Sequence, residues 1–176
     1  MNVAFLVAKE GIEQVELTEP WKAVEQAGHR PVLVSPERGR VRGFHHLDKA
    51  DEFDVDTTAA EASADDYAAL VLPGGVANGD QLRMSKDAVG FVKGFAEAGK
   101  TIAVICHGGW VLIEAGVPRG RRITSWPSLA TDFRNAGADW VDEEVVVDSA
   151  GKGALISSRK PDDLPAFCKE LVQHLT

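Results

Sequence analysis

The sequence places a cysteine and a histidine side by side where a buried strand is expected to turn into a helix. Cys106 follows the apolar run 101–105 and precedes His107 and two glycines. A side chain on such a turn is held out over the edge of a sheet, which is the geometry of a nucleophile elbow. Backbone N–H groups at a helix start stabilise a thiolate and lower the pKa of the thiol. We therefore expect Cys106 to be a reactive nucleophile, with a buried structural cysteine as the alternative.

His107 could assist this nucleophile in two ways. Its backbone N–H could line an oxyanion site, and its imidazole could act as a general acid or base if an acid orients it. Adjacent side chains are expected to diverge, so a catalytic imidazole and a passive neighbour are equally supported. Gly74 and Gly75 end another strand and could present N–H groups to a ligand, although a simple turn explains them equally well.

Three acids, Glu10, Glu13 and Glu16, lie in the loop and first helical turn after the first strand. The helix dipole favours acids there without any further role. Apolar neighbours indicate that part of this turn faces inward, and a partly desolvated carboxyl keeps its proton near neutral pH. A protonated carboxyl close to Cys106 would donate a hydrogen bond to the thiolate.

The remaining candidates give weaker signals. Cys168 lies on the apolar stripe of the final helix, where burial favours the neutral thiol. His45 and His46 would point to opposite faces of a strand, and we assign them no role. No spacing of cysteines and histidines resembles a structural zinc site, and neither GxGxxG nor GxxxxGK[ST] occurs. We expect no metal and no cofactor.

The elements that must position these residues alternate along the chain. Short apolar runs predict strands at 3–8, 31–35, 68–72 and 101–105, and helical spacing predicts helices at 15–27, 85–98, 110–115 and 161–175. A hairpin is expected around 149–153, and a solvated hairpin and loop in the charged segment 38–66. Apolar strands separated by helices predict a doubly wound α/β sandwich with a mostly parallel sheet. Ligands bind beyond the carboxyl ends of such strands, which places three loops, 9–16, 73–80 and 106–109, at the working edge.

Composition limits the classes of protein that fit. The 176 residues suit one domain, 1–176, and the 19 basic against 27 acidic residues give a net charge of −8. This charge argues against nucleic acid or an anionic membrane as the main partner. Two cysteines cannot form a disulfide framework, and neither a signal peptide nor a long apolar span is apparent. We expect a cytoplasmic protein with reduced thiols.

Several stretches together resemble the PfpI family of intracellular cysteine peptidases and deglycases, in the superfamily of the parkinsonism-associated deglycase. They span nearly the whole chain in the family's order: AKEGIEQVEL (8–17), LVLPGG (70–75), AVICHG (103–108), GRR (120–122) with TSWP (124–127), NAG (135–137) with WVD (140–142), and SSR (157–159) with Pro161. The resemblance implies a flavodoxin-like sandwich, similar to class I glutamine amidotransferases. It also implies a homodimer, or in some members a hexamer.

The resemblance also implies roles for single residues. Cys106 matches the family nucleophile, Glu16 the acid that hydrogen-bonds its sulfur, and Gly75 and His107 the positions whose N–H groups line the oxyanion site. Asp80 matches the acid that reaches the histidine from a neighbouring subunit, provided that the loop after Gly75 is one residue longer than usual.

Two tryptophans lie near these motifs. Trp110 stands where many relatives have proline shortly after the histidine, and Trp126 lies in a later matching stretch. Either could form a wall of the substrate pocket. Packing in the core or at an interface is the more ordinary interpretation of both.

Three functions fit these residues. The first is a stress-response deglycase or glutathione-independent glyoxalase. In it the thiolate of Cys106 attacks adducts of methylglyoxal or glyoxal, His107 moves the proton, and water releases lactate or glycolate. The second is peptide hydrolysis by the same nucleophile. The third is a thiol redox sensor or chaperone, in which Cys106 is oxidised and Glu16 hydrogen-bonds the oxidised sulfur. Glycated proteins or small dicarbonyls are the expected substrates.

Overall fold

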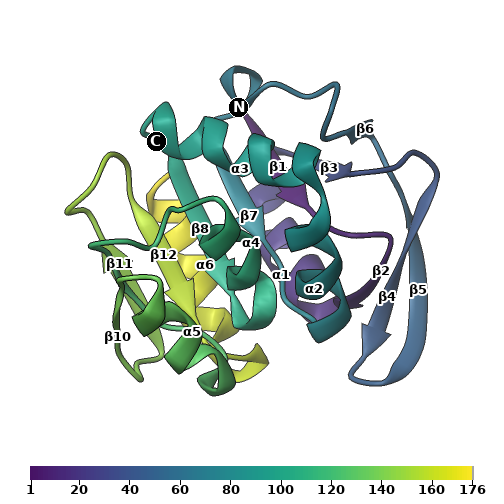
Figure 1. Ribbon diagram of the computed structural model, residues 1–176. Helices are drawn as coiled ribbons and strands as arrows, with labels where there is room; N and C mark the ends of the chain where they lie inside the picture. Colours follow the sequence, from purple (N-terminus) through teal and green to yellow (C-terminus); the bar gives the residue numbers. More distant parts are fainter. Residues whose placement is uncertain (176) are drawn as a thin grey trace.

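A seven-stranded sheet forms the centre of the chain in the computed structural model, which describes residues 1–175 (Figure 1). Its spatial order is β11 (Val145–Asp148), β12 (Leu155–Ser158), β8 (Thr101–Ile105), β7 (Ala69–Leu72), β1 (Asn2–Leu6), β3 (Arg30–Ser35) and β6 (Thr57–Thr58). All neighbouring strands are parallel except the β11–β12 pair. The predicted α/β class with a mostly parallel sheet is confirmed, as is the hairpin around 149–153.

Helices cover both faces of this sheet. Figure 1 shows α2 (Val76–Met84), α3 (Lys86–Glu97) and α4 (Trp110–Glu114) in front of the sheet, and α1 (Gln14–Gln26) and α6 (Leu164–Gln173) behind it. A shorter helix, α5 (Ala130–Asn135), packs the buried side chain of Phe133 into the same apolar cluster as α3 and α4. Single turns of 3-10 helix occur at Ala64–Asp66, Cys106–Gly109, Pro127–Leu129 and Pro161–Asp163.

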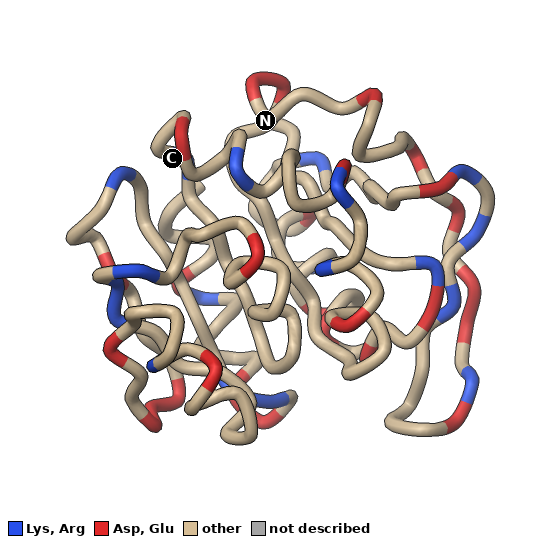
Figure 2. Tube along the Cα trace, in the orientation of Figure 1, with Lys and Arg blue, Asp and Glu red and all other residues tan. Residues whose placement is uncertain are grey.

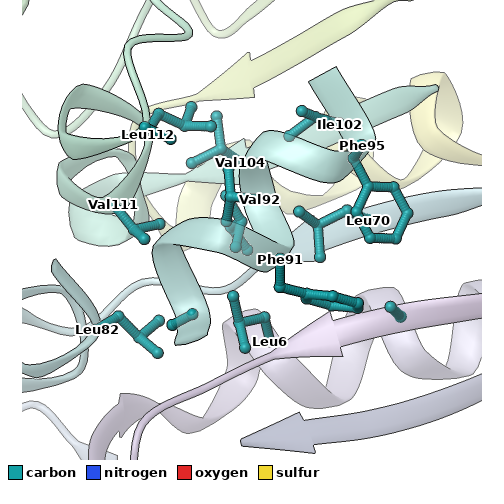
Figure 3. Packing of buried hydrophobic residues seen from close by; sticks show 14 of the residues in the cluster. Leu6, Leu70, Leu82, Phe91, Val92, Phe95, Ile102, Val104, Val111 and Leu112 are labelled. Atoms are coloured by element: carbon teal, nitrogen blue, oxygen red, sulfur yellow. The ribbon is translucent and has the colours of Figure 1, made fainter. Parts of the chain in front are cut away.

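The strand sequences explain why both faces are apolar. Successive side chains of a strand point to opposite faces. In β8, Ile102 and Val104 belong to the front cluster, whereas Ala103 and Ile105 belong to the back cluster. Figure 3 shows Ile102 and Val104 packing beneath the side chains of α3 and α4. Because apolar side chains cover both faces of β8, the strand is held firmly, and this fixes the position of Cys106, which follows it.

A smaller three-stranded sheet lies beside the main one. It consists of β2 (Glu10–Glu13), β4 (Arg40–His45) and β5 (Asp48–Asp54), with β4 and β5 forming an antiparallel hairpin. The charged residues of β4 are basic and most of those of β5 are acidic (Figure 2), and Arg42 of β4 pairs with Glu52 of β5 at 2.6 Å. The predicted solvated hairpin is confirmed. A two-stranded sheet joins β9 (Arg122–Ile123) to β10 (Asp139–Trp140).

The three segments predicted at the working edge, 9–16, 73–80 and 106–109, lie together there, but two of them are not loops. Residues 9–16 contain β2 and the start of α1, and residues 73–80 contain the start of α2. The sequence did not predict α2, because residues such as Asn78 and Gly79 have low helix propensity. The buried amide of Asn78 explains why it forms: it donates to the carbonyls of Pro73 and Gly74 and accepts from the Ala8 N–H at 2.7 Å. Among residues 1–175, no helix combines the length and apolar character needed to cross a bilayer.

Candidate active site

Cys106 occupies the sharp turn that the sequence predicted. It follows β8 directly, begins the 3-10 turn Cys106–Gly109, and has a φ of 60°. A left-handed φ in a residue other than glycine costs on the order of 1–3 kcal/mol, and such strain clusters at active sites. The side chain is 7% exposed at the carboxyl end of the sheet. The turn therefore has the backbone of a nucleophile elbow.

His107 lies closer to the sulfur than the sequence indicated. We expected the two side chains to diverge, and this was wrong, because Nδ1 of His107 is 3.2 Å from Sγ of Cys106. The left-handed backbone at Cys106 and the tight turn that follows bring the two side chains to the same side. In the tautomer that carries its proton on Nε2, Nδ1 can accept the thiol proton.

The two glycines after β7 let the backbone approach the sulfur. A Cβ on Gly74 would clash with a carboxylate oxygen of Glu16 and lie 2.7 Å from Cβ of Cys106, and Gly75 has a φ of 98°. The backbone N–H groups of Gly75 and His107 face Sγ and favour negative charge on it, since both lower the pKa of the thiol. These are the two positions expected to line an oxyanion site.

Glu16 is completely buried beside Cys106. It enters from the first turn of α1, and neither carboxyl oxygen has a hydrogen-bond partner of normal geometry among residues 1–175. Burial, followed by the negative charge of Glu13, raises the pKa of Glu16 to about 8; the Gly74 N–H and the Cys106 thiol oppose this to a smaller extent. The expectation of a protonated inward-facing acid agrees with this direction.

The expected direction of the pKa shift of Cys106 was wrong. Burial raises the pKa of the thiol above its ordinary value, and negative charge on Glu16 raises it further. The N–H groups of His107 and Gly75 lower it, but by less than burial raises it. Burial also lowers the pKa of His107. In the unliganded chain at neutral pH, the thiol, the imidazole and the carboxyl of Glu16 are all mainly uncharged.

Two tryptophans flank the imidazole of His107. The Trp126 ring stacks on it with centroids 5.7 Å apart, and the Trp110 ring meets it at 65° with centroids 5.3 Å apart. Trp110 is itself held by a hydrogen bond from Nε1 to Asp132 at 3.1 Å and lies 5.6 Å from the Arg83 guanidinium. Both tryptophans line the cavity described next, so the pocket-wall interpretation fits their positions.

A cavity of about 700 Å³ opens over the sulfur. Of the eight residues expected to act in catalysis or substrate binding, all but Gly74 line it, namely Cys106, His107, Glu16, Gly75, Asp80, Trp110 and Trp126. Asp80 is exposed on α2 and lines the cavity of its own chain, without a hydrogen bond to His107 within residues 1–175. A site of this volume is typical for a small-molecule ligand.

Sequence reasoning missed one wall of this cavity. Phe44, His46 and Leu47 reach it from the tip of the β4–β5 hairpin, although we had assigned His46 no role. The backbone N–H of His46 donates to Glu13, and its φ of 59° bends the tip. Leu47 is an apolar residue between polar ones in the sequence, and it is 93% exposed in the structure. This apolar residue was the sequence feature that could have indicated a wall of the cavity here. Within residues 1–175, no cluster of three or more His, Cys, Asp or Glu side chains suits a metal ion.

The chain is similar to known proteins over nearly its whole length. Residues 1–174 match the DJ-1/PfpI family. A deglycase from Pyrococcus horikoshii is 42% identical over 175 residues, covering 99% of both chains. A protein/nucleic acid deglycase from Escherichia coli is 39% identical over 177 residues, covering 99% of this chain and 97% of its own.

A solved structure extends the likeness to three dimensions. It is a two-domain protein from Anabaena variabilis with DJ-1/ThiJ/PfpI-like and ferritin-like domains. Its TM-score is 0.90 at 35% identity, over 99% of this chain and 50% of that one. By sequence and by fold, this chain belongs to the DJ-1/PfpI family.

Proposed function

We propose that this protein is a cysteine-dependent deglycase that removes methylglyoxal or glyoxal from early adducts on amines and thiols. The observation that carries the proposal is the 3.2 Å approach of His107 Nδ1 to Cys106 Sγ under an open cavity. Relatives named as deglycases match 99% of the chain, which supports an enzyme of this class.

The proposed reaction begins with formation of the nucleophile. His107 takes the proton from the thiol of Cys106, and the sulfur attacks the carbon that carries the adduct's nitrogen. The C–N bond breaks, the amine leaves with the proton held on His107, and a hemithioacetal remains on Cys106. The amine of the damaged side chain is thereby restored.

The hemithioacetal then rearranges without an external oxidant. For methylglyoxal, hydrogen moves from the thiol-bearing carbon to the neighbouring carbonyl carbon, which converts the hemithioacetal to a lactoyl thioester. Water hydrolyses the thioester to lactate and regenerates the thiol. The backbone N–H groups of Gly75 and His107 are suited to stabilise the oxyanion that forms when water attacks the thioester carbonyl. Free methylglyoxal enters the same sequence by direct addition of the thiol to its aldehyde.

The proton on Glu16 has a role in this scheme. A neutral carboxyl beside Sγ can donate a hydrogen bond to the thiolate, whereas a carboxylate would repel it. Because burial raises the pKa of Glu16 to about 8, the donor form predominates at neutral pH. The rings of Trp110 and Trp126 favour the imidazolium that forms on His107.

The test compares turnover of glycated peptides and of free methylglyoxal by the protein and its variants. Cys106→Ser should abolish lactate release, and Cys168→Ser, on the outer helix α6, is the matched control that should retain it. Lactate release by Cys106→Ser at the unsubstituted rate would refute covalent catalysis. Faster cleavage of casein peptides than of methylglyoxal adducts would favour the peptidase alternative instead.

We also propose a homodimer or hexamer in which Asp80 reaches His107 of a neighbouring subunit. Mixing Cys106→Ser with Asp80→Asn subunits tests this arrangement. If Asp80 acts between subunits, a mixed pair contains one complete site and regains activity that neither variant has. If mixed assemblies form and recover no activity, Asp80 does not act across the interface. The cytoplasmic location and the absence of a cofactor stay predictions from the sequence.

A further inference from the structure

A second cavity lies at the opposite end of β8 from Cys106. It has a volume of about 490 Å³ and is bounded by α3, the amino ends of β8 and β12, the segment after α4 and the β11–β12 loop. Five of the residues that line it are basic, namely Lys93, Lys100, Arg119, Arg121 and Lys152, and one, Glu97, is acidic. The whole chain has 19 basic against 27 acidic residues and is net negative, whereas the lining of this cavity is net positive.

Arg121 forms a fixed wall of the cavity rather than a free charge. Its side chain is 12% exposed and pairs with Asp148 at 3.2 Å. It also donates to the backbone carbonyls of Asp148 and Gly153, at 2.9 and 3.0 Å. These bonds connect the segment after α4 to the β11–β12 loop and hold the cavity open.

Lys100 contributes a fixed charge that no acid neutralises. Its Nζ donates to the backbone carbonyls of Ala64 and Tyr67, each at 2.6 Å. Neither Ala64 nor Tyr67 lines the cavity, so Lys100 adds positive charge beside the cavity through an ammonium that two carbonyls already hold. Among residues 1–175, no carboxylate lies within 4.0 Å of the side-chain nitrogens of Lys93, Lys100, Arg119 or Lys152.

The floor of the cavity is apolar. Ile102 and Leu155, which are paired in register on β8 and β12, form it together with Val117. A ligand that fits this lining carries concentrated negative charge at one end and a less polar body at the other. Lysine and arginine side chains bind phosphate oxygens by charge-assisted hydrogen bonds.

We propose that this cavity binds a small organic phosphate. Cys106 lies four positions after Ile102 in the chain, which is about 13 Å along a strand. A ligand of this size would therefore occupy the cavity without touching the sulfur. The site is distinct from the proposed deglycase site, and neither proposal depends on the other.

Calorimetric titration of the intact protein at low salt tests the proposal. The probes are adenosine monophosphate, glycerol phosphate, inorganic phosphate and adenosine. At least one organic phosphate should bind about tenfold or more tightly than inorganic phosphate and adenosine, since one hydrogen bond to a charged group is worth about that factor.

Two double variants locate the site. Lys93→Gln with Lys152→Gln should weaken that binding by at least about tenfold. Lys86→Gln with Lys169→Gln, which removes the same charge from exposed positions outside the cavity, should leave the affinity unchanged. The proposal is overturned if neither organic phosphate binds at millimolar concentration, if inorganic phosphate binds equally well, or if both double variants weaken binding equally.

Discussion

Replacing the buried carboxyl of Glu16 by an amide should change how the stability of the protein depends on pH. Glu16 is 0% exposed, and its pKa is about 8 in the folded chain against an ordinary value of 4.5. Between these two values the folded chain keeps a proton that the unfolded chain has released. The free energy of unfolding therefore falls as pH rises through this window.

The size of the effect follows from the shift. A difference of about 3.5 pKa units, at about 1.4 kcal/mol per unit, amounts to about 5 kcal/mol between pH 4.5 and pH 8. This is a large fraction of the ~5–15 kcal/mol that stabilises a typical domain. Glu16→Gln has nearly the same volume and cannot ionise, so it should not lose this free energy.

Urea unfolding at several pH values between 5 and 8 measures the effect. The free energy of unfolding of Glu16→Gln, minus that of the unsubstituted protein, should increase steadily with pH. Taking the difference removes the contribution of His107, whose lowered pKa reduces stability as pH falls below 6.5 in both proteins. A difference that is constant from pH 5 to pH 8 would refute the assignment of a buried, protonated Glu16.

Three further outcomes can be checked independently. Asp148→Ala should lower the free energy of unfolding in denaturant by about 3–5 kcal/mol, because it leaves the buried guanidinium of Arg121 without its carboxylate; a loss below 1 kcal/mol would contradict this role. Iodoacetamide should alkylate Cys106 slowly at pH 7, and the rate should continue to increase above the ordinary thiol pKa of 9.0; rapid alkylation at pH 7 would show a preformed thiolate. Leu47→Ala should change the free energy of unfolding by less than about 0.5 kcal/mol yet raise KM for apolar adducts, and an unchanged KM would exclude contact of the hairpin tip with substrate.

The sequence predicted the fold where local pattern and tertiary packing agree. The run 101–105 is buried on both faces and coincides with β8, and the spacing of Ala88, Val92 and Phe95 marks the inward face of α3. It did not predict α2, because that helix is held by the side chain of Asn78 and by contacts with distant elements rather than by its own propensity. Hydrogen bonds of this kind leave no periodic pattern in the sequence.

The candidate site shows the same division. The sequence identified Cys106, because a residue between a buried strand and a glycine-rich turn lies at the carboxyl edge of the sheet. The approach of His107 depends on a left-handed φ at Cys106, which residue spacing does not encode. The sequence argument considered only the N–H groups at the helix start, which lower the pKa of the thiol. Burial by elements from distant parts of the chain has the larger, opposite effect, and it could not be read from the local sequence.

The raised pKa of Cys106 changes which proposed function the site favours. A redox sensor needs a thiolate that is already formed and accessible, whereas this thiol is buried and mainly protonated in the unliganded chain. General base catalysis has no such need, because His107 can take the proton as the sulfur attacks. A neutral Glu16 places no negative charge next to the attacking sulfur. The N–H groups of Gly75 and His107 can then stabilise negative charge on the substrate oxygen. A thiol that is mainly protonated at rest can therefore still attack a carbonyl adduct bound in the cavity, because His107 lies close enough to take its proton.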